Sequence, residues 1–168
     1  MTPLDIVLYP DDGLREVCAP IPEMNDHLDK LIDEMFYTMY DAPGIGLAAP
    51  QIAVQQRLIV VDVSENQDEP IALLNPEVID TKGKITWEEG CLSIPGVYGK
   101  VDRPCEILVR GMNRDGKLIE LEASDLLAVC IQHEIDHLNG KLFIDHLSGL
   151  KRTRALQKYK KDMAEKQD

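Results

Sequence analysis

The sequence has no long hydrophobic run and no clustered cysteines. No stretch approaches 18 uninterrupted apolar residues, so we expect no membrane-spanning helix. The first residues lack the basic start and apolar core of a secretory signal peptide, which makes the cytoplasm the expected location. The four cysteines are widely spaced and show no disulfide pattern, as is usual in a reducing compartment. Internal repeats and low-complexity linkers are also missing.

Basic charge is scarce in most of the chain and is concentrated at its end. The 18 lysines and arginines against 30 acidic residues give a net charge of −12, which disfavours general nucleic-acid binding. Residues 149–168 hold seven basic and three acidic side chains, so the first 148 residues carry −16. The 168 residues suit one domain, and we expect it to span residues 1–168, with 148–168 as a basic C-terminal helix.

The chain does contain the pattern His-Glu-x-x-His. His133 and His137 are four residues apart in an apolar run from Leu126 to Leu138, which predicts a helix with both imidazoles on one face. Two such imidazoles can bind one metal ion, and Glu134 can then act as a general base for hydrolysis. The alternative is a helix with two surface histidines, but polar residues inside a buried helix would be costly without a partner.

A catalytic metal site of this kind needs a third protein ligand and one open position. The position six residues after His137 is Phe143, and the only later glutamate, Glu165, lies in a lysine-rich tail. Cys130 is about 10 Å along the helix axis from His137, so we expect it to line a pocket beside the metal. The remaining candidate is Cys91, next to a glycine on an irregular segment. Two imidazoles and one thiolate by themselves suggest zinc.

The segment from Gly44 to Gln51 is rich in small residues. Its two glycines allow another backbone to come close, but it lacks the lysine and the glycine spacing of a phosphate loop. It predicts either a tight connection packed under a sheet or a strand edge with which a peptide can pair. In the second case Gln51 supplies an amide donor, and this segment alone favours neither reading.

Other elements follow from hydrophobic periodicity. We expect a helix from Asn25 to Tyr40 and a final helix from Ser148 to Met163. Residues 77–87 predict a hairpin that turns at Lys82-Gly83. Residues 94–99, with one proline and two glycines, predict an irregular loop.

Three motifs together resemble the bacterial type of peptide deformylase. They are Gly44-Ile45-Gly46-Leu47-Ala48-Ala49-Pro50-Gln51, Glu89-Gly90-Cys91-Leu92-Ser93 and Gln132-His133-Glu134-Ile135-Asp136-His137-Leu138. They occur in the order and spacing of that family, and the resemblance covers nearly the whole chain. It implies an α+β fold with mixed or antiparallel sheets packed around a central metal-binding helix, followed by a C-terminal helix. It also implies removal of the formyl group from formyl-methionyl peptides, with release of formate.

The resemblance also implies partners and residue roles. The metal would be Fe2+, for which Zn2+, Ni2+ or Co2+ can substitute, and the partners would be nascent formyl-methionyl peptides. We further expect the basic C-terminal helix to bind the ribosome. The implied metal ligands are Cys91, His133 and His137, with Glu134 as the base and Gln51 and the Leu92 N–H as oxyanion donors. The implied substrate contacts are Ile45 and Gly46 for the peptide backbone and Leu126, Val129, Cys130 and His133 for the methionine side chain.

Three other functions share part of this pattern. An endopeptidase would use the same metal chemistry, but Phe143 and the lack of a suitable downstream glutamate ligand argue against it. A structural metal site in a binding module would have a fourth ligand, for which no residue is well placed. A catalytically inactive relative would be expected to lose Glu134 or Gln51, and both are present.

Overall fold

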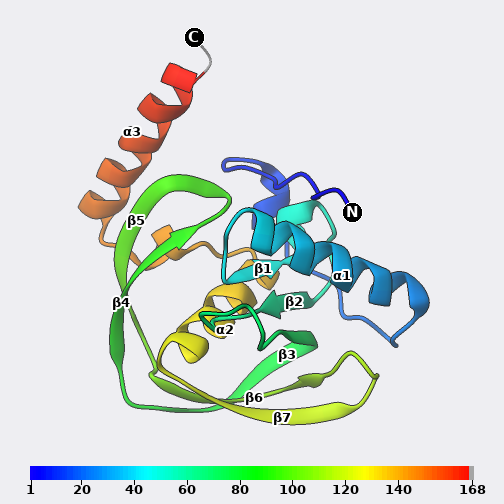
Figure 1. Cartoon of the computed structure of the whole chain (residues 1–168). Coiled ribbons are helices and arrows are strands. Elements are labelled where there is room, and N and C mark those ends of the chain that lie inside the picture. Colours follow the sequence, from blue (N-terminus) through cyan, green and yellow to red (C-terminus); the bar gives the residue numbers. More distant parts are fainter. Residues whose placement is uncertain (167–168) are drawn as a thin grey trace.

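The computed structural model describes residues 1–166, which form two antiparallel sheets and three α-helices (Figure 1). The larger sheet has the order β1 (Gly46–Ala48), β2 (Leu58–Val61), β3 (Ile71–Lys82), β6 (Glu106–Met112) and β7 (Leu118–Ser124). The smaller sheet pairs β4 (Ile85–Cys91) with β5 (Ile94–Arg103). The helices are α1 (Asp26–Asp41), α2 (Asp125–Leu138) and α3 (Gly149–Lys166), with short 3-10 turns at Asp12–Arg15, Ala49–Ile52 and Phe143–His146. The α+β fold expected from the sequence is confirmed.

The strand β2 is buried on both faces, because helices cover both sides of the larger sheet. Its alternate residues Ile59 and Val61 pack in one cluster with Ala128 and Ile131 of α2. Leu58 and Val60 face the other way and pack in a second cluster with the apolar stripe of α1, which contains Leu28, Ile32, Met35 and Met39. A strand that is buried on both faces needs an uninterrupted run of apolar residues, which β2 has. The helix α2 therefore lies at the centre of the molecule, between the two sheets (Figure 1).

The start of α1 and the end of α2 follow local sequence signals. The side chain of Asn25 accepts a hydrogen bond of 2.9 Å from the backbone N–H of Leu28 and so caps α1. At the end of α2, Gly140 adopts a positive φ of 72°, as a residue after a helix C-cap commonly does. Arg57 donates to the carbonyl of Leu138 at 3.1 Å, which fixes the last turn of α2 against the larger sheet.

The C-terminal helix α3 packs on the smaller sheet. Tyr159 is buried among Ile94, Val97 and Val101 of β5, and its hydroxyl donates to the carbonyl of Tyr9 at 2.7 Å. The far end of α3 projects away from the rest of the molecule (Figure 1). Among residues 1–166, no helix combines the length and the hydrophobicity needed to cross a membrane.

Two expectations about strands are wrong. The chain does turn at Lys82-Gly83, but β3 pairs with β6 and β4 pairs with β5, so residues 77–87 form no hairpin. Periodicity identifies strands but not their partners, and here the turn carries the chain from one sheet to the other. Residues 94–99 form the start of β5 rather than a loop. Its Pro95 lies at the beginning of a strand, where the missing N–H is tolerated.

Candidate metal centre

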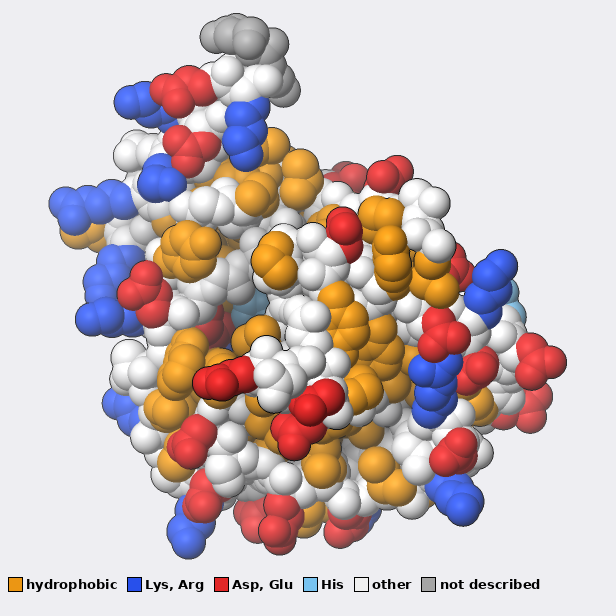
Figure 2. All heavy atoms as spheres, in the orientation of Figure 1, with side chains coloured by type: hydrophobic (Ala, Val, Ile, Leu, Met, Phe, Trp, Pro, Cys, Tyr) orange, Lys and Arg blue, Asp and Glu red, His pale blue; other side chains and the backbone are white. Residues whose placement is uncertain are grey.

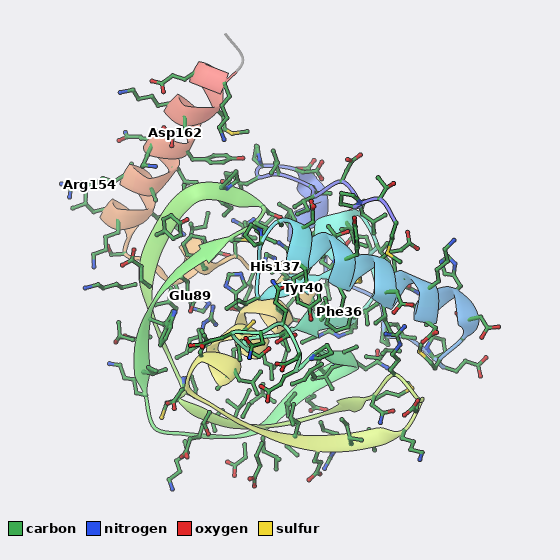
Figure 3. The ribbon with its side chains drawn as sticks, viewed as in Figure 1. Phe36, Tyr40, Glu89, His137, Arg154 and Asp162 are labelled. Carbon is green, nitrogen blue, oxygen red and sulfur yellow. The ribbon has the colours of Figure 1, made fainter. Side chains whose placement is uncertain are left out.

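Two elements bring the predicted metal ligands together. His133 and His137 project from one face of α2, and Cys91 is the last residue of β4. The Cys91 Sγ lies 3.4 Å from Nε2 of His137, and the three ligand atoms all lie within 4.8 Å of one another. Figure 3 labels His137 on α2 and Glu89 on the neighbouring strand. Among the described residues this is the one such group of metal-ligating side chains.

The donor set suits a metal ion of the zinc or iron type. Metal–sulfur and metal–nitrogen bonds of about 2.3 and 2.1 Å in a tetrahedron hold ligand atoms about 3.5 Å apart, close to the separation of Cys91 and His137. Three protein ligands leave a fourth position open, as in hydrolytic sites. The residues therefore fit a catalytic metal rather than a closed structural one.

A buried ion pair orients His133. The Oε1 atom of Glu89 lies 2.9 Å from Nδ1 of His133, and Arg103 binds both oxygens of Glu89 at 2.6 and 2.9 Å. Arg103 also donates to Asp136 on α2 at 3.0 Å. Burial alone would raise the pKa of Glu89, but the hydrogen bonds from His133 and Arg103 outweigh it and lower the pKa. Phe143 stacks against the His133 ring with centroids 6.2 Å apart, so the imidazole is held from two sides.

The two imidazoles differ electrostatically in the metal-free chain. Burial lowers the pKa of His137 well below its usual value, and the nearby His133 lowers it further, so His137 is neutral. Burial would lower the pKa of His133 as well, but the charge of Glu134 and the hydrogen bonds with Cys91 and Glu89 raise it well above its usual value. A metal that binds both rings must therefore displace a proton from His133.

Glu134 is buried beside the ligands and its Oε1 atom has no hydrogen-bond partner among the described residues. Burial raises the pKa of Glu134 to about 7, although the charge of His133 opposes the shift. An unpartnered buried carboxylate is costly unless it serves a polar group that binds there. Gly46 of β1 lies against it, because a Cβ at that position would meet the Glu134 carboxylate and approach the Cys130 Sγ to 2.8 Å. The absence of a side chain at Gly46 thus makes room for Glu134.

Gln51 is almost completely buried in the short 3-10 turn that follows β1. Its Oε1 accepts a hydrogen bond of 2.9 Å from the backbone N–H of Ala48, which settles the orientation of the amide. The Nε2 atom therefore points to the Ser93 hydroxyl at 3.1 Å and to the Cys91 Sγ at 3.5 Å. The amide donor of Gln51 thus lies beside Cys91.

These groups open onto a cavity of about 670 Å³. Figure 2 shows the opening as a hollow with a histidine at its floor and hydrophobic side chains around it. The cavity is lined by nearly every site residue expected from the sequence: Ile45, Gly46, Gln51, Cys91, Leu92, Leu126, Val129, Cys130, His133 and Glu134. His137 belongs to the ligand group behind it.

Three residues of the site were not expected from the sequence: Glu89, Arg103 and Trp87. Glu89 stands two positions before Cys91. If that segment had been predicted as a strand, both side chains would have been expected on one face. Trp87 is two positions further back on the same strand and lines the cavity. No local sequence pattern marks Arg103 as a site residue, because its position beside Glu89 depends on the pairing of β5 with β4.

Comparisons with known proteins agree on one family. The family model described as polypeptide deformylase matches residues 3–153. The chain is similar to a peptide deformylase of Hydrogenovibrio crunogenus, with 84% identity over 165 residues that cover 98% of each protein. It is also similar to the crystal structure of a peptide deformylase from Legionella pneumophila, with 45% identity, a TM-score of 0.94 and 98% of each chain covered. The structure of the Ehrlichia chaffeensis peptide deformylase in complex with actinonin has 38% identity, a TM-score of 0.91 and coverage of 96% of this chain and 98% of the other.

Proposed function

Because the chain belongs to the peptide deformylase family, enzymes that remove the N-terminal formyl group from nascent peptides, we propose that it hydrolyses formyl-methionyl peptides with a bound metal and releases formate. The observation that carries this proposal is the ligand group of Cys91, His133 and His137 beside the buried Glu134 at the floor of an apolar cavity. The cytoplasm, where nascent peptides are made, is the proposed location.

The metal would be held by Cys91, His133 and His137. When bound, it lowers the pKa of a coordinated water and polarises the formyl carbonyl. We take Fe2+ as the resident ion, with Zn2+, Ni2+ or Co2+ able to replace it, since one thiolate and two imidazoles suit all four. Metal analysis of anaerobically purified protein, measured beside its activity, tests this assignment.

Glu134 moves the proton. As a carboxylate it accepts a proton at Oε1 from the water that attacks the formyl carbon. It then gives this proton to the amide nitrogen as the carbon–nitrogen bond breaks. The products are a free methionyl amine and formic acid, which ionises to formate. The burial of Glu134 keeps bulk water away from the proton during the transfer.

The developing negative charge on the formyl oxygen needs hydrogen-bond donors. The Nε2 of Gln51 and the backbone N–H of Leu92 supply them in this proposal. Support comes from Gln51, whose amide is fixed by Ala48 with its donor end toward Cys91. Leu92 follows Cys91 directly and lines the same cavity.

The peptide substrate is proposed to pair along Ile45 and Gly46. The strand β1 is at the edge of the larger sheet, so one of its sides is free for an added strand. The methionine side chain would enter between residues at positions i, i+3, i+4 and i+7 of α2, namely Leu126, Val129, Cys130 and His133. One helix face thus builds both the metal site and the pocket.

The helix α3 is proposed to dock the enzyme on the ribosome. Leu150–Lys161 carries six lysines and arginines, whereas residues 1–148 are strongly acidic. Arg154 extends from α3 away from the body (Figure 3). A basic helix is attracted to polyanionic RNA, and the acidic body opposes binding to nucleic acid elsewhere.

The direct test compares two substrates. The enzyme should release formate from formyl-Met-Ala-Ser and leave the internal peptide bonds of a longer unformylated peptide intact. Acetyl-Met-Ala-Ser serves as a control for the size of the acyl group. Cleavage of the internal bond without formate release would indicate an endopeptidase and contradict the proposal.

A further inference from the structure

Ser93 is a fully buried residue to which the proposed mechanism gives no role. Cys91 at the end of β4 pairs with Ile94 at the start of β5, so Leu92 and Ser93 form the two-residue turn between these strands. Leu92 lines the cavity, whereas Ser93 lies behind the cavity wall with none of its surface exposed. Any effect of the Ser93 hydroxyl on the reaction must therefore pass through a neighbouring side chain.

That neighbour is Gln51, the proposed donor to the formyl oxygen. A side-chain amide has one acceptor oxygen and two N–H groups. The Oε1 atom of Gln51 is held by the backbone N–H of Ala48 at 2.9 Å. The Nε2 atom lies 3.1 Å from the Ser93 hydroxyl and 3.5 Å from the Cys91 Sγ. The bond to Ser93 occupies one N–H, so the other is directed toward Cys91 and the group of metal ligands.

Main-chain hydrogen bonds hold the Gln51 turn and the Ser93 turn together without the Ser93 side chain. The N–H of Val7 donates to the carbonyl of Gln51 at 2.7 Å, and the N–H of Tyr9 donates to the carbonyl of Ser93 at 2.8 Å. One N-terminal segment thus ties the two turns to each other. These bonds remain when the Ser93 hydroxyl is removed, so the loss acts on the amide of Gln51 rather than on the backbone around it.

We propose that Ser93 is a positioning residue, which holds the Gln51 amide so that one of its N–H groups is aimed at the formyl oxygen. The inference rests on the proposed function, because it concerns the donor assigned there. Ser93 directly follows Leu92, whose N–H is the other proposed donor, so the same turn fixes the Gln51 amide relative to the Leu92 N–H. Donors held in place in this way stabilise the transition state more than the bound substrate.

The test is a double-mutant cycle measured with formyl-Met-Ala-Ser. Ser93→Ala should lower kcat by about 5- to 30-fold, the rate equivalent of one lost hydrogen bond to a buried group, and leave KM nearly unchanged. Gln51→Leu should lower kcat by about 100- to 1000-fold, as the loss of an oxyanion donor does. In the Gln51→Leu background, Ser93→Ala should have no further effect, because the amide through which Ser93 acts is missing.

Thr38→Val is the matched control and should leave kcat unchanged, since Thr38 is a buried, hydrogen-bonded hydroxyl on α1. An equal loss of kcat in this control would overturn the inference, because reduced stability would then account for the effect of Ser93→Ala. An unchanged kcat in Ser93→Ala, or the same fold loss with and without Gln51, would overturn it while the proposed function stands. An unmodified enzyme that releases no formate would instead contradict the proposed function.

A second readout does not depend on turnover. The two side-chain amide protons of Gln51 can be followed by NMR in the zinc-loaded enzyme and assigned by their loss in Gln51→Leu. The proton bonded to Ser93 should shift upfield in Ser93→Ala and keep its position in Thr38→Val. Unchanged amide signals in Ser93→Ala would overturn the inference. Fast exchange of both protons with solvent in the unmodified enzyme would overturn it as well, whether or not Ser93→Ala folds.

Discussion

The Oε1 atom of Glu89 lies 2.9 Å from Nδ1 of His133, which leaves only Nε2 of that imidazole free for a metal. Glu89 is in turn held by Arg103, and both side chains are almost fully buried. A carboxylate behind a ligand histidine fixes the ring and raises its basicity. The strand that carries Cys91 thus also orients the His133 imidazole of α2.

We expect Glu89→Gln to weaken metal binding by about 10- to 100-fold, because such outer partners typically contribute that much to affinity. A competition titration with a chelator measures the effect. Glu88→Gln is the matched control, since Glu88 is the neighbouring residue of β4 and is exposed. Equal metal affinity of the two variants would show that the contact with His133 has no such role.

Metal binding should release protons. The pKa of His133 is raised well above its usual value in the metal-free chain, so the ring is protonated near neutral pH and must lose that proton to coordinate. Affinity should therefore weaken as the pH falls through the raised pKa of His133. Calorimetric titration in two buffers of different ionisation enthalpy counts the protons, and identical heats in both buffers would contradict this expectation.

Gly46→Ala should reduce kcat strongly. The added Cβ would meet the Glu134 carboxylate and approach the Cys130 Sγ to 2.8 Å, so the base or β1 must move. A displacement of this kind commonly costs about 100-fold in rate. Gly149→Ala is the control, because nothing lies within 4 Å of a Cβ at that glycine. Comparable steady-state kinetics for the two variants would mean that the site tolerates the methyl group.

The sequence predicted the parts of the site that depend on local spacing. His133 and His137 follow from their separation of four residues, and Cys91 remained after other third ligands were discarded. Glu89, Arg103 and Trp87 could not be predicted in the same way, because their positions depend on β4 pairing with β5 and lying along α2. Pro95 and Gly96 suggested a loop where the chain forms a strand, since partner strands override local propensity.

The docking role of α3 is tested by reversing charge on its exposed face. Lys151→Glu with Arg154→Glu should weaken co-sedimentation with ribosomes, and binding by the unmodified chain should fall steeply with salt. Turnover of formyl-Met-Ala-Ser should stay unchanged, because both side chains are exposed and Tyr159 remains buried against β5. Lys30→Glu with Lys117→Glu, at exposed positions on α1 and in the turn before β7, is the control. If both double variants sediment like the unmodified chain, α3 has no docking role.

Formate release by Glu134→Gln, measured with metal content in the same sample, tests the central claim most directly. Amide and carboxylate have the same shape, so the variant should keep the fold and bind metal with the stoichiometry of the unmodified enzyme. It should release formate from formyl-Met-Ala-Ser at least about 100-fold more slowly, because the proton acceptor is lost. A metal-loaded Glu134→Gln variant that turns over within a few-fold of the unmodified enzyme would contradict the account.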